Sequence, residues 1–311
     1  MIISASFRTD IPAFYGEWFL RRLEAGHCLV KNPYDGKPFS VSLRREHVDG
    51  FFFWTKNLGP FAKKLEILKT RGYPFIVSYS ITGYPRELER SVVSAEKAID
   101  HLRRVAGDFG SRRAVWRYDP ILITSLTDFD FHRRNFDRLA RDLAGSTDEV
   151  VVSFAEMYRK TKRHLFTAAE KFHFSWEDPS DDQKREFLIE LAQIAQARGL
   201  KFSLCAQRQY LSREINDAVC IDVQRLSDVA GLSIHGTKPG HRGKRCGCYQ
   251  SRDIGVYNSC LHGCAYCYAV ESREQAREFY QRHDATAESL ASGDCLNEPL
   301  FPCNRQLSFS M

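Results

Sequence analysis

Three cysteines near the end of the chain, Cys260, Cys264 and Cys267, most constrain what this protein can be. Their C-x3-C-x2-C spacing puts three thiols on one short loop, where they can hold three corners of a cubic [4Fe–4S] cluster. Clusters of the ferredoxin type take four cysteine ligands. A loop with three leaves one iron open to a ligand that is not protein, and this predicts chemistry at the cluster instead of electron storage.

The cysteine loop resembles the cluster loop of the radical S-adenosylmethionine (SAM) superfamily. Tyr266 stands where family members carry an aromatic residue before the third cysteine, close to the adenine of SAM. The resemblance implies a [4Fe–4S] cluster whose open iron is chelated by SAM, which is then cleaved to a 5′-deoxyadenosyl radical. It also implies an external one-electron donor such as a flavodoxin or ferredoxin.

A longer stretch, about residues 1–270, resembles a bacterial family known as DUF1848. The marks of that family lie at residues 2–12, 53–57, 82–85 and 117–120 and in the cysteine loop. The run Arg-Tyr-Asp-Pro at 117–120 is weakly similar to spore-photoproduct-lyase-like proteins. These resemblances supply no substrate, so a small molecule, a peptide and a nucleic acid all stay open.

Short apolar runs alternate with longer helical stretches along the chain. We expect strands at residues 2–6, 50–55, 74–80, 114–118, 149–154, 201–205 and 254–258, and helices at 13–25, 60–71, 86–105, 129–143, 183–198 and 269–282. The strands are continuous apolar runs, as strands buried on both faces are. This alternation predicts an α/β fold with a parallel (β/α) barrel or partial barrel. An open doubly wound sheet is the alternative.

The position of the cysteine loop predicts a circular permutation. The loop of most radical-SAM proteins follows the first strand, whereas here the strand expected at 254–258 comes last. The next strand around the barrel would be 2–6, so the two termini would meet beside the cluster. We expect a single domain over residues 1–284, with the cluster region at 246–269 and an irregular tail at 285–311. Residues 161–182 are interpreted as an insertion.

Four further cysteines form a second candidate metal set: Cys205, Cys220, Cys246 and Cys248. Four thiols are the number needed for a second [4Fe–4S] cluster or a tetrahedral zinc site. The alternative for Cys205 and Cys220 is that they are small buried hydrophobic residues. No metal role is expected for Cys28, Cys295 or Cys303.

Polar residues follow the expected strands, at the end of a barrel where enzymes build their sites. Under the permutation, Ser6, Thr9 and Asp10 are the candidates to accept hydrogen bonds from the SAM ammonium. The alternative for Asp10, which precedes Ile-Pro, is a helix N-cap.

The carboxylate of SAM needs a cation, and its ribose hydroxyls need a hydrogen-bond acceptor. Lys56, Arg117 and Arg159 are the candidates to pair with the SAM carboxylate. Glu156 is the candidate to accept from the ribose. For each of these residues a salt bridge at the barrel rim is the alternative. His262, inside the cysteine loop, is expected to face solvent or to lie just outside the cluster's ligands.

Composition narrows the class of protein. No apolar run reaches the roughly 18 residues that span a bilayer, and the N-terminus lacks a signal-peptide pattern, so we expect a cytoplasmic protein with no membrane contact. Ten cysteines in a reducing compartment favour metal ligation. A net charge of +6 is mild for a nucleic-acid binder.

Three functions remain open from the sequence. A radical-SAM enzyme agrees with the spacing, with Tyr266 and with the strand–helix alternation. An iron–sulfur redox or sensor protein would need a fourth cluster ligand, such as Cys246 or Cys248. A zinc-stapled nucleic-acid-binding module is the third, although C-x3-C-x2-C departs from the usual C-x2-C pairs of zinc sites.

Overall fold

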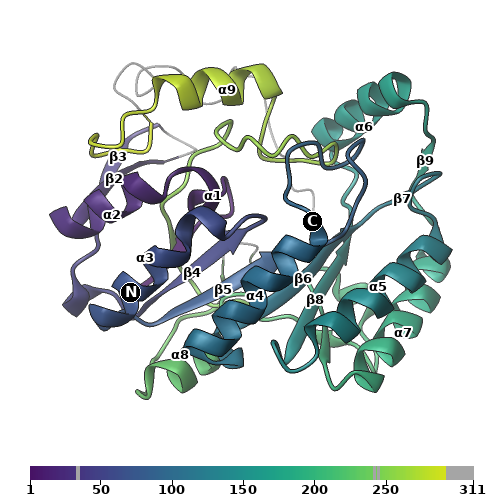
Figure 1. Ribbon diagram of the computed structural model, residues 1–311, viewed down its shortest axis with the longest axis horizontal. Coiled ribbons are helices and arrows are strands. Elements are labelled where there is room, and N and C mark those ends of the chain that lie inside the picture. Colours follow the sequence, from purple (N-terminus) through teal and green to yellow (C-terminus); the bar gives the residue numbers. More distant parts are fainter. Residues whose placement is uncertain (33–35, 241–242, 244–245, 292–311) are drawn as a thin grey trace.

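A computed structural model of the chain describes residues 1–32, 36–240, 243 and 246–291 (Figure 1). At its centre is an eight-stranded sheet with the order β11-β10-β8-β6-β5-β4-β1-β12, in which every pairing is parallel. The strands are β1 (Ile2–Ala5), β4 (Gly50–Thr55), β5 (Phe75–Ser80), β6 (Ala114–Ile121), β8 (Glu149–Phe154), β10 (Lys201–Leu204), β11 (Asn216–Asp217) and β12 (Arg252–Asp253). The expected α/β class with a parallel sheet is confirmed.

The sheet is buried on both faces, which explains its continuous apolar strands. Side chains alternate between the faces of a strand. Phe51 and Phe53 of β4 therefore join the large core under the helices. Phe52 points the other way, into a second apolar cluster that also contains Cys220 and Cys248. The second candidate metal set thus lies on the face of the sheet opposite the large core.

Helices and two short antiparallel strand pairs surround the sheet. The helices are α1 (Ile11–Phe14), α2 (Gly16–Ala25), α3 (Ala62–Thr70), α4 (Ala95–Phe109), α5 (Phe129–Leu143), α6 (Arg159–Phe172), α7 (Asp181–Ala197), α8 (Val223–Ala230) and α9 (Arg273–Arg282). The minor strands pair as β2 (His27–Lys31) with β3 (Pro38–Ser42), and β7 (Ile123–Thr124) with β9 (Trp176–Glu177). Figure 1 shows α9 and the cysteine-bearing segment before it along the top of the view, running from above α2 toward α6.

Two expected elements need correction. The helix expected at 86–105 begins only at Ala95, because the Ser94 side chain caps its first turn by accepting from the Lys97 N–H. The strand expected at 254–258 is wrong, since β12 is the preceding dipeptide. Residues 161–182, interpreted as an insertion, contain most of α6 together with β9.

The last strand of the sheet lies beside the first. β12 pairs in parallel with β1, with Ile3 opposite Arg252 and Ser4 opposite Asp253. The N-terminal ammonium, however, forms an ion pair of 2.9 Å with Asp49 at the amino ends of the strands, away from the cysteine loop. The N-terminus therefore does not lie beside that loop, and the other end of the chain, residues 292–311, is outside the described residues.

The expected tail is partly built into the fold. Ala291 is buried in the core, and the Trp18 indole of α2 donates to the Ala287 carbonyl at 3.1 Å. Cys295 and Cys303 lie outside the described residues. In the part of the chain that the structure describes, no helix is both long enough and apolar enough to cross a membrane.

Candidate functional site

A cavity of about 280 Å³ lies at the carboxyl ends of the sheet strands, with the cysteine loop as one wall. Its size is near the lower end of small-molecule sites, which run from roughly 300 to 1,000 Å³. The cysteines predicted as ligands all line it: Cys205, Cys220, Cys246, Cys248, Cys260, Cys264 and Cys267. The predicted cofactor-binding residues line it too: Ser6, Thr9, Asp10, Lys56, Arg117, Glu156 and Tyr266.

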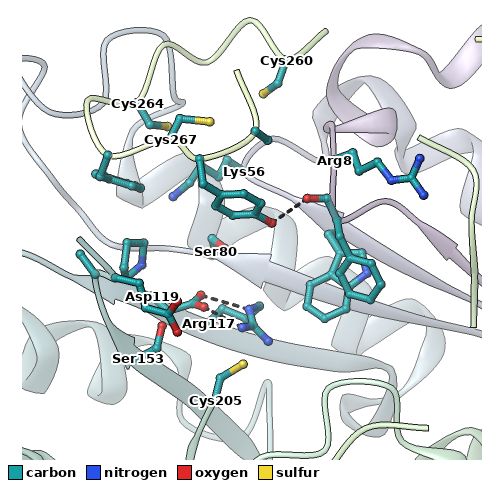
Figure 2. A pocket seen from close by; sticks show the side chains of 18 of the residues that line it. Arg8, Lys56, Ser80, Arg117, Asp119, Ser153, Cys205, Cys260, Cys264 and Cys267 are labelled. Carbon is teal, nitrogen blue, oxygen red and sulfur yellow. Dashed lines mark hydrogen bonds and ion pairs between the residues drawn. The ribbon is translucent and has the colours of Figure 1, made fainter. Parts of the chain in front are cut away.

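The cysteine loop is anchored to the rest of the fold by its main chain. The Tyr15 hydroxyl donates to the Ser259 carbonyl at 2.6 Å, just before the first cysteine. The Ala265 N–H donates to the Leu88 carbonyl at 2.9 Å, between the second and third. The three thiols are therefore presented to the cavity from anchored backbone positions, and Figure 2 shows all three on one side of the pocket.

Burial controls the protonation of the loop thiols. It raises the pKa of Cys260, Cys264 and Cys267 above the ordinary value for a thiol. The Lys56 ammonium opposes this rise at Cys264. The loop thiols are therefore neutral in the absence of a metal, and a metal that binds them displaces their protons.

A buried histidine–aspartate pair ties the loop to the first strand. The Nε2 atom of His262 lies 2.7 Å from Oδ2 of Asp10, and both residues are buried, so of the two positions expected for His262 the solvent-facing one is excluded. Asp10 also caps α1 by accepting from the Ala13 N–H at 2.9 Å. Its Oδ2 further accepts from the Thr55 hydroxyl at 3.1 Å and the Lys56 N–H at 2.7 Å. Four donors thus surround this carboxylate already.

A carboxylate that the sequence analysis missed lies under the loop. Oε1 of Glu89 accepts from Lys56 at 2.8 Å, from Thr82 at 2.7 Å and from the Tyr266 hydroxyl. Burial by itself would raise the pKa of Glu89, but Lys56 lowers it below its ordinary value. Burial likewise disfavours the Lys56 ammonium, yet Glu89 raises its pKa. Both groups are therefore charged at neutral pH.

Arg117 of β6 is paired within the cavity wall. Its guanidinium binds the Asp119 carboxylate through two bonds of 3.0 and 2.6 Å (Figure 2). It also lies 4.9 Å from the centre of the Trp54 ring and donates to the Cys220 sulfur at 3.2 Å. Arg159, at the start of α6, is exposed and does not line the cavity.

The second set of cysteines gathers at the ends of β10 and β11. The sulfur atoms of Cys205 and Cys220 are 3.6 Å apart, and the Cys220 N–H donates to the Cys248 sulfur at 3.2 Å. Figure 2 shows Cys205 on the far side of Arg117 and Asp119 from the loop thiols. Within the described residues, no three His, Cys, Asp or Glu side chains are already gathered tightly enough to hold a single ion.

The end of β1 is shaped by Asp253, another residue without a signal in the sequence. Its carboxylate accepts from the Ser6 hydroxyl and from the Gly255 N–H, both at 2.9 Å. Thr9 lies close by with its hydroxyl oxygen buried, and this atom has no hydrogen-bond partner among the described residues. Glu156 lines the cavity after β8.

The fold and the site define an α/β protein with a cysteine-lined cavity at the carboxyl ends of a parallel sheet. Over residues 2–269 the chain matches the family described as "Domain of unknown function (DUF1848)", and it belongs to that family. No curated protein and no solved structure matches it. The family description states no activity.

Proposed function

We propose that the protein is a radical-SAM enzyme in which Cys260, Cys264 and Cys267 hold a [4Fe–4S] cluster. The observation that carries this proposal is the anchored loop that presents three thiols to a cavity. When bound there, the cluster and SAM would supply a 5′-deoxyadenosyl radical able to remove one hydrogen atom from a substrate. An external one-electron donor would reduce the cluster.

Two buried polar atoms beside the loop lack a hydrogen-bond partner in the part of the chain that the structure describes, and this supports the binding of a ligand there. Buried polar side-chain atoms in folded proteins nearly always have a hydrogen-bond partner. The Thr9 hydroxyl and the Nδ1 atom of His262 have none among the described residues, and both residues line the cavity. Ser6 and Asp10 already have partners. Thr9 is therefore the best of the three candidates to accept from the SAM ammonium.

The chain's charged residues would prepare the loop for an anionic cluster. Lys56 stabilises a thiolate at Cys264, because it lies near enough to oppose the rise in that thiol's pKa. Glu89 keeps Lys56 charged and accepts a hydrogen bond from the Tyr266 hydroxyl. The Tyr266 ring is thereby held next to Cys267, where the resemblance implies the adenine. Glu156 remains the candidate for the ribose.

We further propose that the sheet closes into a barrel in a permuted order. From β1 to β11 each strand of the main sheet pairs with the next one in the chain, and β12 pairs with β1. The edges β11 and β12 are therefore the neighbours that closure would join. This order supports a radical-SAM barrel whose cluster strand comes last.

The two alternative functions have less support. An iron–sulfur redox protein would need a fourth thiolate at the loop. Cys248 lies instead with the second set of cysteines, where its sulfur is 3.2 Å from the Cys220 nitrogen. Among the residues that the structure describes, no contact favours a zinc-stapled nucleic-acid-binding module.

The test uses anaerobically purified and reconstituted protein. We expect 5′-deoxyadenosine from SAM and dithionite, with about four irons and four sulfides at the loop. Cys264→Ala should abolish both product and cluster. Cys28→Ala is the matched control, because Cys28 is a buried core residue of β2, and it should leave both unchanged. A full cluster without any product would contradict the proposal and favour a redox or sensor protein.

A further inference from the structure

We propose a second metal centre in this protein, held by the four thiolates of Cys205, Cys220, Cys246 and Cys248. Four thiolates select a soft metal, so the occupant is a zinc ion or a second iron–sulfur cluster. The centre does not depend on the SAM chemistry proposed above, because no residue of the cysteine loop belongs to it.

Three chain segments converge on this site through main-chain hydrogen bonds. Cys205 directly follows β10, and its N–H donates to the Val152 carbonyl of β8 at 2.8 Å. Cys220 follows β11, which pairs with β10. The third segment is docked by the Tyr249 N–H, which donates to the Ile221 carbonyl at 3.1 Å. The backbone positions of these cysteines are therefore set by the fold itself.

The sulfur positions suit a shared metal. Ligands of a tetrahedral zinc ion at about 2.3 Å from the metal lie about 3.8 Å from one another. The distance of 3.6 Å between the Cys205 and Cys220 sulfurs is close to this value. Since four thiols are not yet gathered around one point, metal binding would complete the shell by side-chain rotation. A cluster would instead spread the same thiols apart.

The glycine between Cys246 and Cys248 lets their turn pack closely against β11. A Cβ atom on Gly247 would lie 3.1 Å from a carboxylate oxygen of Asp217 and 3.3 Å from the Ala218 carbonyl. A side chain there would be tightly packed, because these neighbours would have to give by a few tenths of an ångström. The turn thus places both of its thiols beside the strand end that carries the third ligand.

A buried cation distinguishes this set from ordinary core cysteines. The Arg117 guanidinium is buried and donates to the Cys220 sulfur at 3.2 Å, in addition to its pair with Asp119. Four thiolates around a divalent ion carry a net negative charge, and a cation at this distance offsets it. Since Arg117 and Asp119 also line the cavity, the substrate space would lie between two metal centres.

The test removes the loop thiols and counts the remaining metal. A full-length Cys260→Ala/Cys264→Ala/Cys267→Ala variant is purified anaerobically and analysed for zinc, iron and acid-labile sulfide. We expect either about one zinc or about four irons and four sulfides per chain. X-ray absorption separates the two, because zinc would show only sulfur neighbours at about 2.3 Å.

A second pair of variants assigns that metal to its ligands. Adding Cys246→Ser and Cys248→Ser to the loop variant should remove the metal, whereas adding Cys28→Ala should leave it in place. If the serine variant does not fold, thiol titration of the loop variant tests whether the four cysteines hold the metal. Its four site thiols should react with a thiol reagent only after a chelator removes the metal.

Two results would overturn the second centre. One is a folded loop variant that contains no metal and whose site thiols react at once. The other is a disulfide between Cys205 and Cys220 in protein purified under reducing conditions. Neither result bears on SAM cleavage, which is measured on the wild type, so the two proposals fail independently.

Discussion

The Nζ atom of Lys56 lies 2.8 Å from Oε1 of Glu89, and this pair joins the strand ends to the cysteine loop. Lys56 follows β4, Thr82 follows β5, and Tyr266 belongs to the loop. All three donate to the same carboxylate oxygen. A single acidic residue thus holds together parts of the chain that are far apart in sequence.

Loss of the Glu89 charge should destabilise the protein strongly. Glu89→Gln leaves the Lys56 ammonium largely buried without a counter-charge. We expect the free energy of unfolding to fall by about 3 kcal/mol, since breaking a buried ion pair on one side has costs of that size. Urea denaturation measures this change in the free energy of unfolding. The exposed Glu66→Gln is the control and should change the value by less than about 0.5 kcal/mol.

The same pair predicts a pH dependence with a definite sign. The pKa of Glu89 is lowered, so its contribution is present above the ordinary pKa of roughly 4.3 and is lost as the pH falls through the lowered value. The pKa of Lys56 is raised, so its contribution persists up to at least the ordinary value of roughly 10.4. The difference between wild type and Glu89→Gln should therefore be flat between about pH 6 and 9. It should shrink in acid, and a constant difference down to about pH 2 would contradict the pairing.

Local signals predicted most of the sheet, because its strands are apolar on both faces. The run at 50–55 and the helix at 129–143 have the bounds that the sequence predicts. β12 could not be found in this way. It is a polar dipeptide, Arg252–Asp253, and it is a strand only because β1 lies beside it.

The candidate site was likewise predicted from the sequence only where its residues carry a local pattern. The spacing of the cysteines predicted that they belong together, and the strand ends predicted which polar residues would line the cavity. Glu89 was hidden inside an expected helix, and its bond to Tyr266 spans 177 positions of the chain. Its role is defined by tertiary contacts, for which neither residue carries a local pattern.

Removal of the Asp10 carboxylate should loosen the cysteine loop. Asp10→Ala removes a helix cap and leaves the His262 ring and the Lys56 N–H without their acceptor. We expect a loss of about 3 kcal/mol in the free energy of unfolding and less iron per chain after reconstitution. The control is Asp128→Ala, because Asp128 only caps α5. It should cost about 1 kcal/mol and leave the iron content unchanged. Equal iron in both variants would show that Asp10 does not position the loop.

A methyl group at Gly255 should disturb the junction of β12 with the first strand. A Cβ atom there would lie 1.9 Å from the Ser6 hydroxyl oxygen, so Ser6 would have to move. We expect Gly255→Ala to destabilise the fold by about 2 kcal/mol. Gly107→Ala is the opposite case, because it adds a methyl to α4 with no atom within 4 Å. It should stabilise the fold by about 0.5–1 kcal/mol. Thermal unfolding of both variants tests the contrast, and a neutral Gly255→Ala would contradict it.

Substitution of Thr9 by valine should raise the stability of the protein but weaken its binding of SAM. Its buried hydroxyl has no partner among the described residues, so Thr9→Val removes an unsatisfied polar group while it keeps the shape of the side chain. We expect the free energy of unfolding without SAM to rise by about 1 kcal/mol. If Thr9 accepts from the SAM ammonium, the reconstituted variant should bind SAM about five to ten times more weakly in equilibrium dialysis. Thr9→Ser keeps the hydroxyl and should restore the affinity. Unchanged SAM binding in Thr9→Val would exclude Thr9 from the SAM site, although the gain in stability would still be expected, because it follows from the unpaired hydroxyl alone.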